Sequence, residues 1–168
     1  AADDAAPSCP ALLDHRFPAL QDEKLQSLCQ YAGKVVLVVN TASKCGYTKQ
    51  YDGLERLYDK YRERGLVVLG FPSNDFNHEP GSNEEIAEFC RSTYGVRFPM
   101  FARSTVAGRS ANPFYVRLAE VSGERPQWNF HKYLIDRSGS KVTSFPSQLS
   151  PESPLLVGTI EKLLASRP

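Results

Sequence analysis

The stretch VVLVVNTASKCGYTKQY, residues 35–51, decides how this chain folds. It opens with an apolar, mostly β-branched run, which is typical of a strand buried on both faces of a parallel sheet. Cys45 follows in a small polar turn, just before a segment with helical spacing. Free cysteines are often simply buried, but backbone N–H groups at the start of a helix can also hold a thiol as a nucleophilic thiolate. Because the sites of open α/β sheets lie at the carboxyl ends of strands, we expect Cys45 to be reactive.

A strand–helix–strand unit surrounds this turn. Residues 51–61 carry large side chains at helical spacing, and Gly65 is a natural helix end. The run LVVLGFP, residues 66–72, is a second buried strand, so the order predicts a right-handed βαβ unit. Ser82 followed by Glu85 is a capping box that begins the next helix.

The rest of the chain adds shorter elements, identified by caps, turns and periodicity. We expect a short helix over residues 24–34, a helix over 112–123, a strand hairpin of 131–136 with 140–145, and a closing helix from 153; residues 98–103 are ambiguous between strand and loop. This order predicts the α/β class, with a thioredoxin-like fold whose central mixed β-sheet is flanked by helices on both faces. We expect one domain overall, with residues 1–32 as a lead-in packed on a domain of residues 33–168.

The charge balance argues against some classes of partner. Lys and Arg number 20 against 19 Asp and Glu, which is a formal net charge of +1. Such a balance gives no reason to expect a nucleic acid or a membrane surface as partner. The apolar runs are also far shorter than the roughly 20 residues that a membrane span needs, so none is expected.

The cysteines indicate the redox state of the compartment in which the protein resides. Cys9 and Cys29 could form a structural disulfide or remain two free thiols, and we expect the bridge. The bridge and the small-residue start AADDAA, typical of a mature end after signal-peptide removal, predict a periplasmic or secreted protein, with the cytoplasm as the alternative. Neither C-x-x-C nor zinc-ligand spacing occurs, so no metal or cofactor is expected.

Three longer motifs occur in order along the chain. They are NTASKCGYTKQYDGLE (40–55), FPSNDFNHEPGSNEEIAEFC (71–90) and WNFHKYLIDRSG (128–139). They resemble the signatures of the glutathione peroxidase family, in its cysteine-containing, non-seleno, bacterial-like and thioredoxin-dependent type. Three ordered motifs of this length are a far more specific signal than one short pattern.

The resemblance implies an antioxidant thiol peroxidase that reduces hydrogen peroxide and organic hydroperoxides. Cys45 would attack the peroxide and become a sulfenic acid, which a second thiol would resolve. The family surrounds its thiol with a Gln, a Trp and an Asn, and Trp128 and Asn129 match the last two. Their N–H donors suit a developing anion.

The second motif departs from the family pattern F-P-C-N-Q-F-G-x-Q-E-P-G. It is one residue shorter, and His78 stands where the family has its Gln. His78 could take over the role of that Gln or act as an acid or base near neutral pH. Alternatively the shortened loop moves it out of reach, and Asn74 supplies the donor.

Cys90 is the candidate resolving thiol, because it matches the position used by relatives that recycle through an internal disulfide. Ser73 stands where many relatives have Cys, so that position cannot resolve here. Ile86, Phe89 and Cys90 share the apolar face of their helix, which predicts a buried thiol in the reduced protein. Two cysteines bridge only when their Cα atoms lie within about 7 Å, so the helix must unwind locally if Cys45 is distant.

The same resemblance also indicates which molecule reduces the enzyme and how many subunits it has. A resolving cysteine favours reduction by a thioredoxin-like protein, with glutathione as the alternative. Only ERPQ separates the helix over 112–123 from the WNF motif, whereas tetrameric relatives carry a longer insertion there. We therefore expect a monomer with an open site.

Other functions remain open at this level. A peroxide-sensing redox relay or a thiol–disulfide oxidoreductase would use the same couple of Cys45 and Cys90, although the lack of C-x-x-C disfavours the second. A binding domain with an inert Cys45 would share the fold. A hydrolase built on Cys45 and His78 is weaker still, because no orienting partner or oxyanion hole is recognisable.

Overall fold

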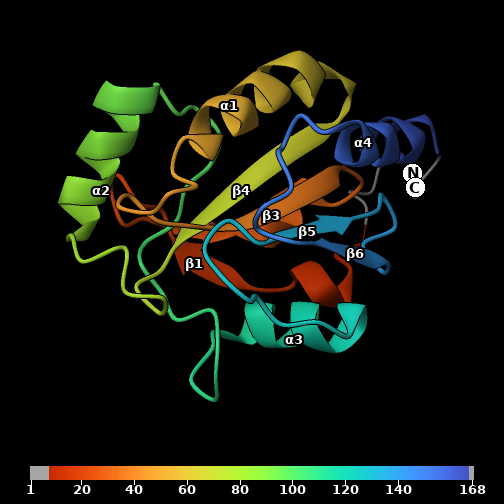
Figure 1. The fold of residues 1–168 in the computed structure, drawn as a ribbon. Coiled ribbons are helices and arrows are strands. Elements are labelled where there is room, and N and C mark those ends of the chain that lie inside the picture. Colours follow the sequence, from red (N-terminus) through yellow and green to blue (C-terminus); the bar gives the residue numbers. More distant parts are fainter. Residues whose placement is uncertain (1–7, 167–168) are drawn as a thin grey trace.

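A four-stranded mixed sheet in the order β4–β3–β5–β6 forms the centre of the molecule (Figure 1). The computed structural model describes residues 8–166. β3 runs parallel to β4 and antiparallel to β5, and β5 is antiparallel to β6. The strands are β3 (Val35–Thr41), β4 (Leu66–Pro72), β5 (Lys132–Ile135) and β6 (Val142–Phe145).

Helices cover both faces of this sheet. In Figure 1, α1 (Gln50–Tyr61) and α4 (Pro154–Ala165) lie above the strands, and α3 (Pro113–Ser122) lies below them. α2 (Asn83–Phe89) packs on the same hydrophobic cluster as α1 and α4. This arrangement confirms the expected α/β thioredoxin-like fold with helices on both faces.

Because helices cover both faces of the sheet, the continuous apolar sequences of β3 and β4 suit their positions. All residues of both strands are buried. In β3 the side chains alternate between two cores: Val35, Leu37 and Val39 join the cluster under α1 and α4, while Val36 and Val38 join the cluster under α3. A strand covered on both faces needs apolar side chains at every position rather than at alternate ones.

The predicted helix ends are observed. The Ser82 hydroxyl accepts from the Glu85 backbone N–H, and the Glu85 carboxylate accepts from the Ser82 N–H, which is the expected capping box. Asn112 and Ser153 cap α3 and α4, each followed by proline. Gly65 ends the α1 segment with φ +113°, a conformation that favours glycine.

The expected helix over residues 24–34 is largely wrong. Leu25–Ser27 forms strand β2, which pairs with β1 (Arg16–Pro18), and only Leu28–Tyr31 forms a short 3₁₀ turn. Leu25 is 63% exposed whereas Leu28 is buried, so these two leucines, which lie three residues apart, do not form one buried helical face. The ambiguous residues 98–103 form single bridges to β4 and to Ala19 instead of a full strand.

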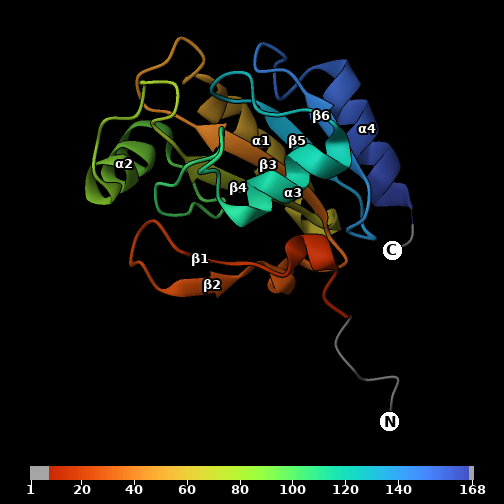
Figure 2. The same cartoon turned by 90° about the horizontal axis from the view of Figure 1, so that it is seen from below.

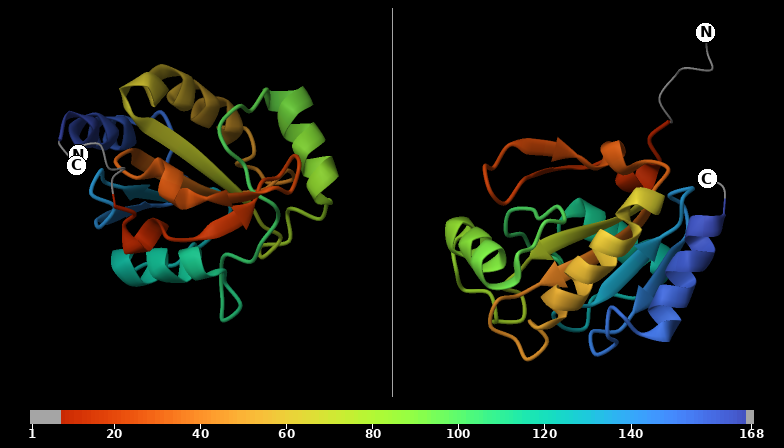
Figure 3. Two further views of the ribbon diagram at one scale, coloured as in Figure 1. Left: turned by 180° about the vertical axis from the view of Figure 1, so that it is seen from behind. Right: turned by 90° about the horizontal axis from the view of Figure 1, so that it is seen from above.

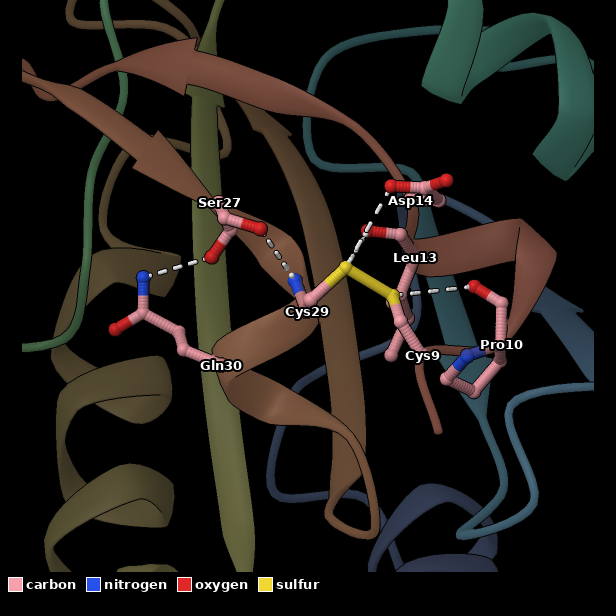
Figure 4. The surroundings of a disulfide bond; sticks show 7 residues. All are labelled: Cys9, Pro10, Leu13, Asp14, Ser27, Cys29 and Gln30. Carbon is pink, nitrogen blue, oxygen red and sulfur yellow. Dashed lines mark hydrogen bonds between the residues drawn. A yellow bond between two sulfur atoms is a disulfide. The ribbon is translucent and has the colours of Figure 1, made fainter. Parts of the chain in front are cut away.

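The lead-in packs beside the β4 edge of the sheet (Figures 2 and 3). Leu12, Leu13 and Leu28 are buried in the cluster under α3. A disulfide joins Cys9 to Cys29 with a Cα–Cα distance of 5.2 Å (Figure 4), as expected. Residues 1–7 of the lead-in lie outside the described part of the chain. Within residues 8–166, no helix is long and apolar enough to cross a membrane.

Candidate active site

Three loops meet at one edge of the sheet because of the strand directions. β3 and β4 are parallel, with Thr41 opposite Pro72, so their carboxyl ends lie side by side. β5 is antiparallel to β3, with Lys132 opposite Val39, so β5 begins at that same edge. The loops that follow β3 and β4 and the loop that precedes β5 carry the three family motifs.

A hydrogen-bonded turn holds Cys45. Its backbone N–H donates to the Thr48 hydroxyl at 2.9 Å, and that hydroxyl donates to the Ala42 carbonyl at 2.9 Å. The Tyr47 backbone N–H donates to Cys45 Sγ at 3.4 Å. α1 begins only at Gln50, so an amide of the turn, rather than the first turn of the helix, faces the sulfur. Cys45 is half-buried, so the residue remains partly in contact with solvent.

His78 lies in the neighbouring loop and is tied to the Cys45 turn. Its carbonyl accepts from the Lys44 backbone N–H at 3.0 Å. Its ring Nδ1 lies 2.5 Å from the Phe76 carbonyl oxygen, so Nδ1 carries the proton and donates. In the neutral ring Nε2 is therefore an acceptor, unlike the amide N–H₂ of the family Gln. The His78 ring also meets the Trp128 indole edge to face, with centroids 5.0 Å apart.

Asn74 has a different task in the same loop. Its Oδ1 accepts from the Glu79 backbone N–H at 3.0 Å, and its carbonyl accepts from the Asn77 N–H at 2.9 Å. Asn77 has φ +63° in this turn, a left-handed conformation that asparagine adopts more readily than most residues. The Asn74 side chain thus stabilises the loop itself.

Trp128 and Asn129 differ sharply in exposure. Trp128 is 37% exposed and packs against Phe76, with ring centroids 5.4 Å apart. Asn129 is fully buried, and neither Nδ2 nor Oδ1 has a hydrogen-bond partner within residues 8–166. An unpaired buried amide costs about 1–3 kcal/mol, so this group is a candidate to bind an oxygen of a substrate.

Asn40, at the end of β3, holds the Trp128–Phe130 segment and was not identified from the sequence. Its Nδ2 donates to the Trp128 carbonyl at 3.0 Å, and its own carbonyl accepts from the Phe130 N–H at 2.7 Å. In the sequence, the only sign of this role was a polar residue at the end of an otherwise apolar strand. Its side chain links the β3 edge to the WNF motif.

Glu79 is a second residue that sequence reasoning missed. Its side chain is 1% exposed, and a carboxylate oxygen accepts from the Ser43 hydroxyl at 2.8 Å. Burial raises the pKa of the Glu79 carboxyl, and the Ser43 hydrogen bond partly opposes that rise. With Ile86 and Phe89 these two residues line a cavity of about 430 Å³ between the Cys45 turn and α2. In the sequence, the only sign of this role was an acidic residue directly before Pro-Gly within the second motif.

Cys90 lies where α2 ends and a π-helical turn, Cys90–Tyr94, begins. The thiol is buried, as expected. Burial raises the pKa of Cys90 to about 11, and the negative charge of Glu79 adds to this rise. The Tyr51 hydroxyl nearby opposes it, although the two groups do not meet the geometry of a full hydrogen bond. The folded protein therefore holds Cys90 as a neutral thiol.

The structure brings several predicted site residues together. His78 touches Trp128, its loop is bonded to the Cys45 turn, and Asn129 follows Trp128 in the chain. Cys45 packs on the same hydrophobic cluster that contains Cys90.

The lead-in contains one group of potential metal ligands within the described residues, namely Cys9, Asp14 and Cys29. Its two sulfur atoms are bonded to each other, so neither is a thiolate (Figure 4). A metal ligand of this kind must be deprotonated and free. The described residues therefore hold no metal at this position while the bridge is intact.

Known proteins are similar to this chain over most of its length. The family model described as "Glutathione peroxidase" matches residues 15–119. A glutathione peroxidase-like peroxiredoxin of Schizosaccharomyces pombe is 51% identical over 137 residues, which is 79% of this chain and 85% of that protein. A glutathione peroxidase of Lactococcus lactis subsp. cremoris is 48% identical over 143 residues, covering 82% and 90%.

Solved structures agree. The crystal structure titled Trgpx in apo form has a TM-score of 0.76 and 34% identity, and covers 95% of this chain and 99% of its own. T. cruzi GPX1 gives a TM-score of 0.71 at 30% identity, over 94% and 98%. The family expected from the three motifs is confirmed, and with it the peroxidase class of enzyme: this chain belongs to the glutathione peroxidase family.

Proposed function

We propose that this protein reduces hydroperoxides with Cys45 as the peroxidatic thiol and Cys90 as the resolving thiol. The observation that carries the proposal is the position of Cys45, half-buried at the carboxyl edge of β3 with the Tyr47 N–H aimed at its sulfur. Trp128, Asn129 and His78 belong to loops at that same edge. Hydrogen peroxide and organic hydroperoxides are the substrates that the family implies.

In the first step, the Cys45 thiolate attacks the terminal peroxide oxygen. The O–O bond breaks as the S–O bond forms, so sulfur is oxidised to sulfenic acid and the peroxide is reduced. The leaving alkoxide or hydroxide takes a proton and departs as alcohol or water. The unpaired amide of Asn129 and the indole N–H of Trp128 would stabilise the charge on that leaving oxygen.

In the second step, the sulfur of Cys90 attacks the sulfenic sulfur of Cys45. A disulfide forms, and the hydroxyl leaves as water with the proton of the Cys90 thiol. The raised pKa of Cys90 makes this thiol a poor nucleophile within the folded helix. The π-helical turn that begins at Cys90 is a natural place for local unwinding, because such turns interrupt the regular helical hydrogen bonds.

The disulfide would then be reduced by a dithiol protein of the thioredoxin kind, with glutathione as the alternative. Two electrons pass from the dithiol to the disulfide through a mixed disulfide. Cys45 is half-buried already in the reduced protein, so its sulfur is a candidate point of attack for the reductant. We also propose a periplasmic or extracellular location, because the Cys9–Cys29 bridge suits an oxidising compartment. We propose a monomer because only ERPQ precedes the WNF motif, where tetrameric relatives carry a longer insertion.

Stopped-flow mixing of the reduced protein with hydrogen peroxide tests the central proposal. Trp128 is the only tryptophan, so its fluorescence should report the oxidation, and a sulfenic-acid trap should label Cys45. Cys45→Ser should abolish both signals, whereas the matched variant Cys90→Ser should keep them. Slow oxidation that survives Cys45→Ser would contradict the peroxidase assignment to this residue.

A further inference from the structure

Lys132, the first residue of β5, is a buried amine without a carboxylate partner among the described residues. Its side chain is 0% exposed, and no carboxylate in the described part of the chain pairs with it. Burial lowers its pKa to about 7. An uncompensated ammonium in a protein interior is costly, so packing alone does not account for a lysine at this position.

The Lys132 amine holds the carbonyl of Phe130, the last residue of the Trp128–Asn129–Phe130 (WNF) segment. Lys132 Nζ donates to the Phe130 carbonyl at 2.7 Å. Phe130 has φ +65°, an uncommon conformation for a bulky residue that persists only where its surroundings enforce it. Asn40 holds the other side of the segment through its bonds to Trp128 and Phe130. Lys132 and Asn40 thus clamp the backbone on both sides of Asn129.

The same amine also donates to a second loop. Its other bond goes to the Ser147 carbonyl at 3.1 Å, which also accepts from Gln50 Nε2 at 2.8 Å. Gln50 is the first residue of α1, directly after the Cys45 turn. One buried side chain therefore connects the WNF motif with the start of the helix that follows the reactive cysteine.

We propose that Lys132 is a positioning residue, which fixes the Phe130 carbonyl and thereby aims the Asn129 amide and the Trp128 indole at the leaving oxygen of the peroxide. The proposal rests on the proposed function, because it requires these two side chains to act on a peroxide at Cys45. Lys132 itself touches no reacting atom. Its effect is on the geometry of the donors and not on the thiol.

Two reactions of Cys45 distinguish this role from general support of the fold. Attack on hydrogen peroxide needs the thiolate and also donors for the leaving oxygen, whereas alkylation by iodoacetamide needs mainly an accessible thiolate. Both rates can be read by mass spectrometry on the Cys45 peptide of the full chain. A residue that positions Asn129 and Trp128 affects only the first reaction, while a residue that supports the fold in general affects both.

The test variant is Lys132→Met, an unbranched side chain of similar volume, one atom shorter, that lacks the donors. Lys141→Met, at an exposed lysine that precedes β6, is the matched control. We expect Lys132→Met to slow the peroxide reaction by between about ten- and a hundredfold, the usual result of displaced catalytic groups, and to leave alkylation within about twofold. Lys141→Met should change neither rate.

Two results would overturn the proposal: a wild-type peroxide rate in Lys132→Met, or an equal loss in both reactions. A wild-type Cys45 that reacts with peroxide no faster than free cysteine would instead defeat the proposed function itself. Should Lys132→Met not fold, Lys132→Gln takes its place, because it keeps a neutral donor but is too short to reach both carbonyls. The same selective loss is expected, and an unchanged peroxide rate would again refute the role of Lys132.

Discussion

The imidazole of His78 meets the indole of Trp128 edge to face, with ring centroids 5.0 Å apart. The contact joins the loop after β4 to the loop before β5, although fifty residues separate them in the chain. It keeps His78 beside the WNF motif even though its loop is shorter than the family pattern. His78, rather than Asn74, is therefore the better candidate for the position of the family Gln.

Replacement of His78 by Gln should preserve the rate of peroxide attack. Nδ1 of His78 donates to the Phe76 carbonyl, so only Nε2 is left to face the site, and Gln would place there the polar amide of the family pattern, with a donor and an acceptor. His78→Phe should lower the rate by about tenfold or more, because it removes the polar group and keeps the aromatic contact. Stopped-flow oxidation of Cys45 is the measurement. A complete loss in His78→Gln would reveal proton chemistry that only the imidazole can perform.

Replacement of Cys90 by Ser should leave the first oxidation intact and stop turnover with a thioredoxin-like reductant. The sulfenic acid on Cys45 then has no internal partner, so it should accumulate. A coupled assay of reductant consumption, run beside a sulfenic-acid trap, checks both expectations. Unchanged turnover would contradict the assignment of Cys90 as resolving thiol.

The pH dependence of disulfide closure should reveal whether α2 unwinds. In the folded helix the pKa of Cys90 is about 11, so closure from that state would accelerate with pH up to about 11. After local unwinding the thiol regains an ordinary pKa of about 8.5, and closure should level off near that pH. We expect the second behaviour, measured by quenched-flow alkylation after a peroxide pulse. A rise that continues toward pH 11 would show attack from the intact helix.

Acid should destabilise the protein through His131. This ring is 1% exposed, its Nε2 lies 2.6 Å from the Ser144 hydroxyl, and burial lowers its pKa to about 4. Below pH 6.5 His131 becomes protonated in the unfolded chain, whereas in the native state it stays neutral until about pH 4. The free energy of unfolding therefore falls as the pH drops through this window. The loss is at most about 3 kcal/mol. Urea titrations of wild type and His131→Gln should show a weaker pH dependence in the variant.

Loss of the Cys9–Cys29 bridge should affect stability and not catalysis. The bridge closes a loop with a sequence separation of 20, and such loops stabilise by about 3 kcal/mol in the chain-entropy model. Cys9→Ser with Cys29→Ser should lower the free energy of unfolding by about that amount, measured by urea titration. The rate of Cys45 oxidation should stay unchanged; a large loss of rate would mean that the lead-in takes part in the site.

Much of the fold could be predicted because its signals are local. The apolar runs of β3 and β4, the capping box at Ser82 and the prolines after Asn112 and Ser153 act over a few residues, and all agree with the structure. The helix expected over residues 24–34 failed because pairing with β1 outweighed weak helical spacing. Strand pairing is a contact between distant segments that periodicity does not record.

The sequence alone determined the family, the peroxidase class and the identity of the candidate nucleophile. These depend on three linear motifs, which can be read from the order of residues without the fold. Only the tertiary structure decided the protonated nitrogen of His78, the burial that raises the pKa of Cys90, and the anchoring of the WNF motif by Asn40 and Lys132. The reason is physical: burial and hydrogen-bond partners set these properties, and both depend on strands and loops that meet at one edge of the sheet only after folding.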